Sequence, residues 1–121
     1  MRWVGVGAIV VGLGIAMGAF GAHLLKSTLS EPALAQWQTA QTYQMWGGLS
    51  LVICGILSSK LDIKRVPMLM LAGVIVFSGT VYGLALGGPR WLGAITPIGG
   101  VLLITSWLLV ALQALRAEPR S

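Results

Sequence analysis

Few residues in this chain carry side chains that could do chemistry. It has one histidine, His23, one cysteine, Cys54, and three acidic residues. Nucleophilic catalysis by serine needs a base and an orienting acid, but His23 is the sole candidate base and Glu31 the only acid expected on its side of the molecule. Haem and metal sites need several ligands close together, and the sequence places none in this way. We therefore expect no enzyme, no metal and no cofactor.

Polar side chains are more informative than charged ones. Gln38, Gln41 and Gln44 follow one another at three-residue spacing and lead to Gly48. A buried amide without a partner costs roughly 2–7 kcal/mol, so these side chains must face other helices, a water-filled pocket or a partner subunit. The predicted helices bring them to one end of the molecule with other polar groups. This candidate polar cluster comprises His23, Gln41, Tyr43, Gln44, Ser78, Tyr82 and Thr96.

The composition shows which elements must position these residues. Hydrophobic residues make up 56% of the 121 positions, charged residues only 9%, and the mean hydropathy is +0.87. Soluble domains carry about 25% charged residues, so the chain is predicted to be an integral membrane protein. The net charge of +5 comes from short basic clusters between apolar runs. The basic residues form no stripe of the kind that follows a phosphate backbone, which excludes nucleic acid as a partner.

Four runs predict an all-α, integral membrane four-helix bundle in a single domain over residues 1–121. Roughly twenty helical residues cross the ~30 Å hydrocarbon core. The second run is the least obvious, because its purely apolar part, Met45 to Leu57, is too short to span alone. Ser30 followed by Glu31-Pro32 is a good N-cap signal, so one long helix is predicted from about Glu31. The predicted spans are about 3–25, 36–57, 66–88 and 91–115.

The basic residues predict the orientation. An even number of spans puts both termini and the central loop on one side. The basic residues on that side are Arg2, Lys60, Lys64, Arg65, Arg116 and Arg120, against Lys26 and Arg90 on the other. The positive-inside rule then predicts that both termini are cytoplasmic. Aromatic belts would place Trp3 and Trp107 at the inner interface and Trp37 and Trp91 at the outer one.

Small residues at four-residue spacing let membrane helices approach closely. Two runs contain such series, and both are candidates for tight helix contacts, within the chain or with another copy. The predicted packing residues are Gly14, Gly18, Gly21 and Ala22 in the first run and Gly79, Gly83 and Gly87 in the third.

Four short motifs, in order along the chain, resemble the domain of unknown function 423 family. They are Gly18 to Leu24 (GAFGAHL), Tyr43 to Met45 (YQM), Phe77 to Tyr82 (FSGTVY) and Leu92 to Gly100 (LGAITPIGG). The resemblance covers essentially the whole chain. It implies a multi-pass protein of the bacterial inner membrane with four helices, and no established activity. Relatives typically carry a histidine where this chain has Gly47, so a role that needs two histidines is doubtful here.

Two functions remain open. The first is a non-enzymatic interaction protein of the bilayer, either a homo-oligomer or an accessory subunit that binds other membrane subunits. The alternative is a small-solute channel or transporter with an outward-facing polar site around His23, Gln41, Gln44 and Tyr82. Tight pairing of the polar side chains would favour the first, and a water-accessible cavity through them the second.

Overall fold

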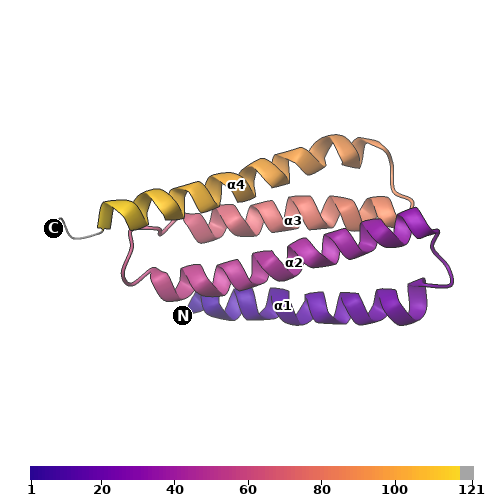
Figure 1. The fold of residues 1–121 in the computed structure, drawn as a ribbon, viewed down its shortest axis with the longest axis horizontal. Helices are drawn as coiled ribbons and strands as arrows, with labels where there is room; N and C mark the ends of the chain where they lie inside the picture. Colours follow the sequence, from indigo (N-terminus) through magenta and orange to yellow (C-terminus); the bar gives the residue numbers. More distant parts are fainter. Residues whose placement is uncertain (118–121) are drawn as a thin grey trace.

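The computed structural model describes residues 1–117, which form helices and connections without a β-strand. The helices alternate in direction along one long axis (Figure 1). They are α1 (Arg2–Phe20), continued by the π-helix η1 (Gly21–Leu25), α2 (Glu31–Leu57), α3 (Val66–Ala85) and α4 (Trp91–Ala117). The all-α prediction is confirmed.

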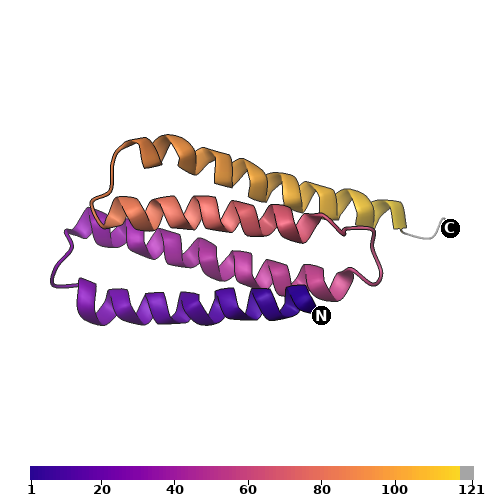
Figure 2. The same ribbon diagram turned by 180° about the vertical axis from the view of Figure 1, so that it is seen from behind.

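Each helix packs mainly on its neighbour in sequence. The extensive contacts are α1 with α2, α2 with α3, and α3 with α4. Within residues 1–117, α1 and α4 share at most a marginal contact, and the two lie at opposite sides of the assembly in both ribbon views (Figures 1 and 2). The helices therefore form an open series in which α2 and α3 are central.

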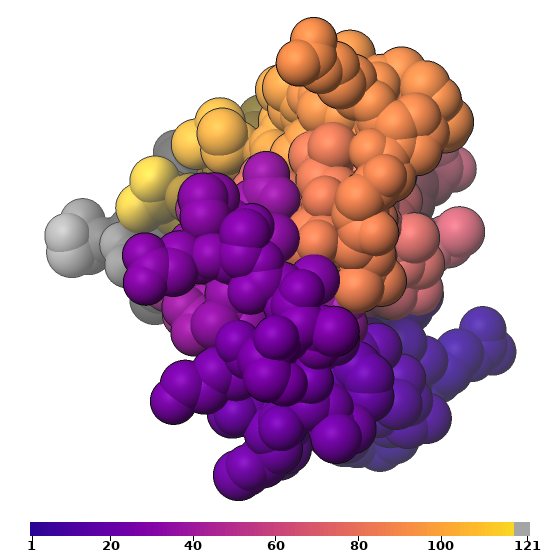
Figure 3. Space-filling model, turned by 90° about the vertical axis from the view of Figure 1, so that its right-hand side faces the viewer, coloured from indigo at the N-terminus to yellow at the C-terminus, as the bar shows by residue number. Residues whose placement is uncertain are grey.

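The two ends of the helix series differ in charge. The N-terminus, the α2–α3 connection and the last turn of α4 lie at one end (Figure 1). The α1–α2 and α3–α4 connections, with Lys26 and Arg90, lie at the other, which Figure 3 views directly. This arrangement matches the grouping of basic residues on which the orientation depends, although one of them, Arg120, lies outside the described residues.

Three of the helices are long and apolar enough to cross a membrane: Arg2–Leu25, Val66–Ala85 and Trp91–Ala117. The exception is α2, whose first half carries the glutamines. It lies between α1 and α3 and contributes many of the buried residues. A polar helix can occupy this central place because its neighbours cover much of its surface.

Local signals explain where the helices begin and end. Ser30 caps α2 as predicted, since its Oγ accepts a hydrogen bond from the Ala33 N–H at 3.2 Å. Helix α3 ends at Ala85, before the predicted residue 88, because Gly87 adopts a φ of +88° in the turn. Helix α4 continues through Pro97.

The α1–α2 interface is closest near the end that holds the N-terminus. A Cβ on Gly7 would lie 2.6 Å from the carbonyl oxygen of Gly48, and one on Gly55 would lie 2.8 Å from the Val4 backbone nitrogen. These two helices thus meet backbone to backbone. Beside this contact lies the apolar core, formed by Leu51, Cys54, Ile63, Val66, Met70 and Val110.

The predicted packing glycines fall into two groups. Those of the first run, Gly14, Gly18 and Gly21, face side chains of α2, whereas Ala22 is exposed. In the third run, Gly83 meets the Leu92 side chain, but a Cβ added at Gly79 or Gly87 would meet no atom within 4 Å. They do not mediate helix contacts within this chain, because Gly79 faces outward and Gly87 lies in the turn. The close α3–α4 approach instead involves Gly73 and Gly99.

Substituting Gly7 by Ala should destabilise the protein relative to Gly5→Ala. Both changes raise the helix propensity of α1 by about 1 kcal/mol, but only Gly7 lies against α2, and Gly5 faces open space. Overpacking costs about 1–3 kcal/mol, so the free energy of unfolding should differ by about that amount. Unfolding in mixed detergent micelles measures it. Equal stability of the two variants would contradict the backbone contact.

Candidate functional site

Three side chains in the first half of α2 donate hydrogen bonds to backbone carbonyl oxygens of α1. The bonds run from Trp37 Nε1 to Met17 O (2.8 Å), from Gln41 Nε2 to Gly14 O (3.3 Å) and from Gln44 Nε2 to Val10 O (3.1 Å). A carbonyl oxygen has two lone pairs, so it can accept such a bond besides its bond within the helix. We call these three contacts the hydrogen-bond ladder.

Glycines on α1 and η1 make room for the ladder. A Cβ on Gly21 would lie 2.5 Å from Trp37 Nε1, and one on Gly18 would lie 3.0 Å from Gln41 Nε2. Bulkier residues would therefore hold α2 too far away for its side chains to reach the α1 backbone. The small residues of the first run and the polar stripe of the second are two sides of one interface.

Further hydrogen bonds connect the ladder to α3. The Tyr82 hydroxyl donates to Gln44 Oε1 at 2.6 Å, and the Ser78 hydroxyl donates to the Ala40 carbonyl at 2.8 Å. The Gln44 amide thus contacts α1 through its nitrogen and α3 through its oxygen. A single side chain joins three helices.

A separate polar contact joins α3 to α4. The hydroxyl oxygens of Thr80 and Thr96 lie 2.6 Å apart, and each also lies within hydrogen-bond distance of a carbonyl oxygen in its own helix. One hydroxyl can therefore donate to the other while the second donates to its own backbone. Thr96 belongs to the candidate polar cluster, but its partner Thr80 does not. Thr80 lies two residues from both Ser78 and Tyr82, which the cluster does include.

The structure does not bring the whole candidate polar cluster together. His23 is exposed on η1. Tyr43 packs its ring 4.4 Å from that of Phe77 and 5.1 Å from that of Trp46, measured between centroids. Trp37, expected at the outer membrane interface, is 4% exposed and belongs to the ladder. In the sequence, this role of Trp37 was indicated only by its position shortly before Gln41.

The interior polar groups are paired. In the described part of the chain, every buried side-chain nitrogen or oxygen has a hydrogen-bond partner. Within residues 1–117 no three His, Cys, Asp or Glu side chains gather as metal ligands would. The chemistry that this arrangement supports is mutual recognition between helices.

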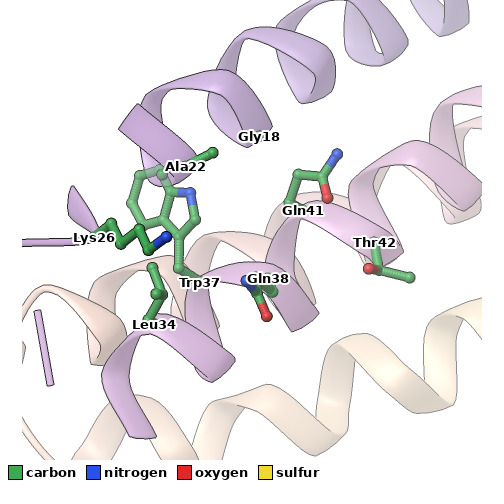
Figure 4. A pocket seen from close by; sticks show the side chains of 9 residues that line it. Gly18, Ala22, Lys26, Leu34, Trp37, Gln38, Gln41 and Thr42 are labelled. Carbon is green, nitrogen blue, oxygen red and sulfur yellow. The ribbon is translucent and has the colours of Figure 1, made fainter. Parts of the chain in front are cut away.

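Two hollows lie beside this network. A polar pocket of about 550 Å³ lies where η1 faces the first half of α2 (Figure 4), lined by Gly18, Gly21, Ala22, Lys26, Leu34, Trp37, Gln38, Gln41 and Thr42. An apolar groove of about 330 Å³ lies between α2 and α4, lined by Tyr43, Trp46, Gly47, Ser50, Leu103, Ile104, Trp107 and Leu108.

Gly47 packs directly against α3. A Cβ at this position would overlap the side chain of Val74 on α3. A histidine therefore could not be accommodated without displacing Val74, and this part of the α2–α3 interface is closed by direct packing.

Helix lengths, composition and fold together define an integral membrane protein whose described residues, 1–117, form four helices. The profile of the family described as "Protein of unknown function (DUF423)" matches residues 17–100. The chain belongs to this family.

Its relatives include several proteins named as membrane proteins. UPF0382 membrane protein SERP0230 of Staphylococcus epidermidis is 42% identical over 113 residues, covering 92% of this chain and 93% of the relative. The similarly named SSP2132 of Staphylococcus saprophyticus is 44% identical over 109 residues, with coverage of 88% and 91%. UPF0382 membrane protein YwdK of Bacillus subtilis is 37% identical over 115 residues, with coverage of 92% and 94%. No solved structure matches the chain significantly.

Three of the four motifs that carry the family resemblance meet one another in the fold, and the first packs against the part of α2 that precedes the second. The first supplies the glycines that face Gln41 and Trp37. The second and third meet through Gln44 and Tyr82, and the third and fourth meet through the threonine pair. The motifs therefore lie at interfaces between helices that are neighbours in sequence.

A double-mutant cycle on Gln44 and Tyr82 should show coupling. Gln44→Leu removes the bonds to both neighbouring helices, whereas Tyr82→Phe removes only the bond between the two side chains. Polar contacts between membrane helices are worth about 0.6 kcal/mol on average and up to about 1.7 kcal/mol. We expect a coupling free energy in this range, measured by unfolding in mixed micelles.

Two exposed residues serve as controls for this cycle. Gln36→Leu changes an exposed glutamine of the same helix, and His23→Ala changes the exposed histidine of the candidate polar cluster. Surface changes usually alter stability by less than about 0.5 kcal/mol, and we expect that of both. Additive effects of Gln44→Leu and Tyr82→Phe would contradict the network.

Proposed function

We propose that this protein is a non-enzymatic interaction protein of the bacterial inner membrane, acting as a homo-oligomer or as an accessory subunit of a larger membrane complex. The observation that carries this proposal is the pairing of its interior polar side chains. Gln41, Gln44, Ser78, Tyr82 and Thr96 all bond to neighbouring helices. Side chains that are used in such contacts stabilise the packing of the helices.

The open helix series supports the same proposal. Helices α1 and α4 each have one principal neighbour, so most of their surface is available to lipid or to another chain. The apolar groove between α2 and α4 includes two large exposed indoles, with Trp46 59% and Trp107 44% exposed. Aromatic side chains are enriched at protein interfaces, which makes this groove the best candidate surface for a partner helix.

The alternative, a small-solute channel or transporter, has one supporting feature, the polar pocket beside Gln41. Its lining reaches only as far as Thr42, in the first half of α2. Beyond that level, Gln44 is engaged on both sides by Val10 and Tyr82. The pocket therefore supports binding at one end of the helices better than passage between the two ends.

The interaction proposal predicts a stable assembly that depends on the groove. We would extract the protein into nanodiscs at native expression, measure particle size and identify co-purifying chains by mass spectrometry. Leu108→Trp, which fills the groove, should lower recovery of the assembly about fivefold or more, because well-packed interface positions cost over about 1 kcal/mol when disturbed. Leu112→Trp, on the same helix but outside the groove, is the matched control. A monomer from the unchanged protein, or equal effects of both variants, would contradict the proposal.

We further propose that both termini face the cytoplasm, because the more basic end should lie inside. Accessibility of introduced cysteines tests this in a Cys54→Ala background. Ser27→Cys, in the α1–α2 connection, should react with a membrane-impermeant maleimide added to spheroplasts, and Ser59→Cys, in the α2–α3 connection, should react only after lysis. Both serines are exposed. The reverse labelling pattern would show the opposite orientation.

A further inference from the structure

The polar pocket lies at the end of the molecule where α1 passes through η1 into the α1–α2 connection. Its volume of about 550 Å³ falls within the range of roughly 300–1,000 Å³ that is typical of ligand sites. Lys26 is the only charged residue in its lining (Figure 4). The electrostatic character of the pocket is therefore cationic.

The pocket also contains polar groups that the helix contacts do not use. Among the described residues, the hydrogen bonds from side chains in this part of α2 come from Trp37, Thr39, Gln41 and Gln44. The amide of Gln38 and the hydroxyl of Thr42 donate none of these hydrogen bonds, and they lie one turn apart on the lining of the pocket. Both side chains are exposed. A ligand could accept hydrogen bonds from each of them while its charge lies near Lys26.

The depth of the pocket relative to the bilayer defines what can reach it. Helix α2 has 27 residues, which makes it about 40 Å long at ~1.5 Å per residue. That exceeds the hydrocarbon thickness of ~30 Å, so the ends of α2 extend into the headgroup region. Leu34 and Gln38, in the first turns, lie near this boundary. Lys26 lines the same pocket, so groups at this boundary are within its reach.

We propose that this pocket binds a phosphate-bearing polar group, with the phosphate at Lys26 and hydrogen-bond acceptors of the ligand at Gln38 and Thr42. Lysine is a common phosphate ligand that acts as a point charge. The chemistry is shared by the headgroup of an anionic phospholipid and by a soluble phosphate ester. The site is separate from the apolar groove, so it does not depend on the proposed interaction role.

Native mass spectrometry of the full chain, freed of lipid in detergent, tests the site. One arm titrates phosphatidylglycerol and, for comparison, uncharged diacylglycerol, and the other titrates glycerol phosphate and inorganic phosphate. Lys26→Gln removes the charge and keeps similar bulk, and Ala22→Trp obstructs the pocket from an exposed position. The matched controls are Lys60→Gln, at the other end, and Ala8→Trp, an exposed position of α1 outside the pocket.

The expected result is weaker phosphate-dependent binding in both pocket variants. A basic residue near a lipid surface contributes about 1 kcal/mol, so Lys26→Gln should weaken binding about fivefold, and Ala22→Trp by at least as much. If these losses occur with phosphatidylglycerol, the ligand is a lipid headgroup, and if they occur with glycerol phosphate or inorganic phosphate, it is soluble. Binding that is equal with diacylglycerol, absent in both arms, or reduced equally by the control variants would overturn the proposal.

Discussion

The fold depends on one constraint of the bilayer, which is that no water is available there to hydrogen bond to polar groups. Helix α2 carries an amide-rich first half that would be costly against lipid. The protein meets this constraint by giving α2 a central position and by pairing Trp37, Gln41 and Gln44 with the α1 backbone. The glycines of α1 and the short distance between the two helices follow from the same requirement, because the side chains must reach carbonyl oxygens that a bulkier helix would cover.

The α1–α2 interface divides into two halves that differ in the distribution of small residues, with glycines on both helices toward the N-terminus. Toward the connection between the helices, glycines of the first run face large polar side chains of α2. Toward the N-terminus, Gly48 and Gly55 of α2 face Val11 and Val4 of α1. In the half toward the connection, polar contacts fix the position of one helix along the other. In the half toward the N-terminus, close backbone packing brings the two helices together. A shift of one helix along the other would lose both kinds of contact at once.

Much of the fold was predictable from the sequence, and less of the site. Apolar runs and the Ser30 cap predicted the helices to within a few residues, because length, hydropathy and capping are local properties. Which polar side chains meet is not local. Gln44 was recognised from the cost of leaving an amide unpaired. Its partner on α1 could not be recognised, because it is the backbone carbonyl of Val10 and every residue has a backbone carbonyl. Likewise, the third run contains regularly spaced glycines, yet only the rotation of the helix decides that Gly73 rather than Gly79 faces a neighbour.

The serial arrangement of the helices also bears on how the chain can be assembled. Since each helix packs mainly on its neighbours in sequence, the principal contacts of α1 are complete once α2 has been synthesised, and those of α2 once α3 has followed. No late closure between the first and last helices is needed. Contacts of short sequence separation favour rapid folding, so the protein can acquire its tertiary structure step by step as its helices enter the membrane. Polar α2 would find its hydrogen-bond acceptors already in place on α1.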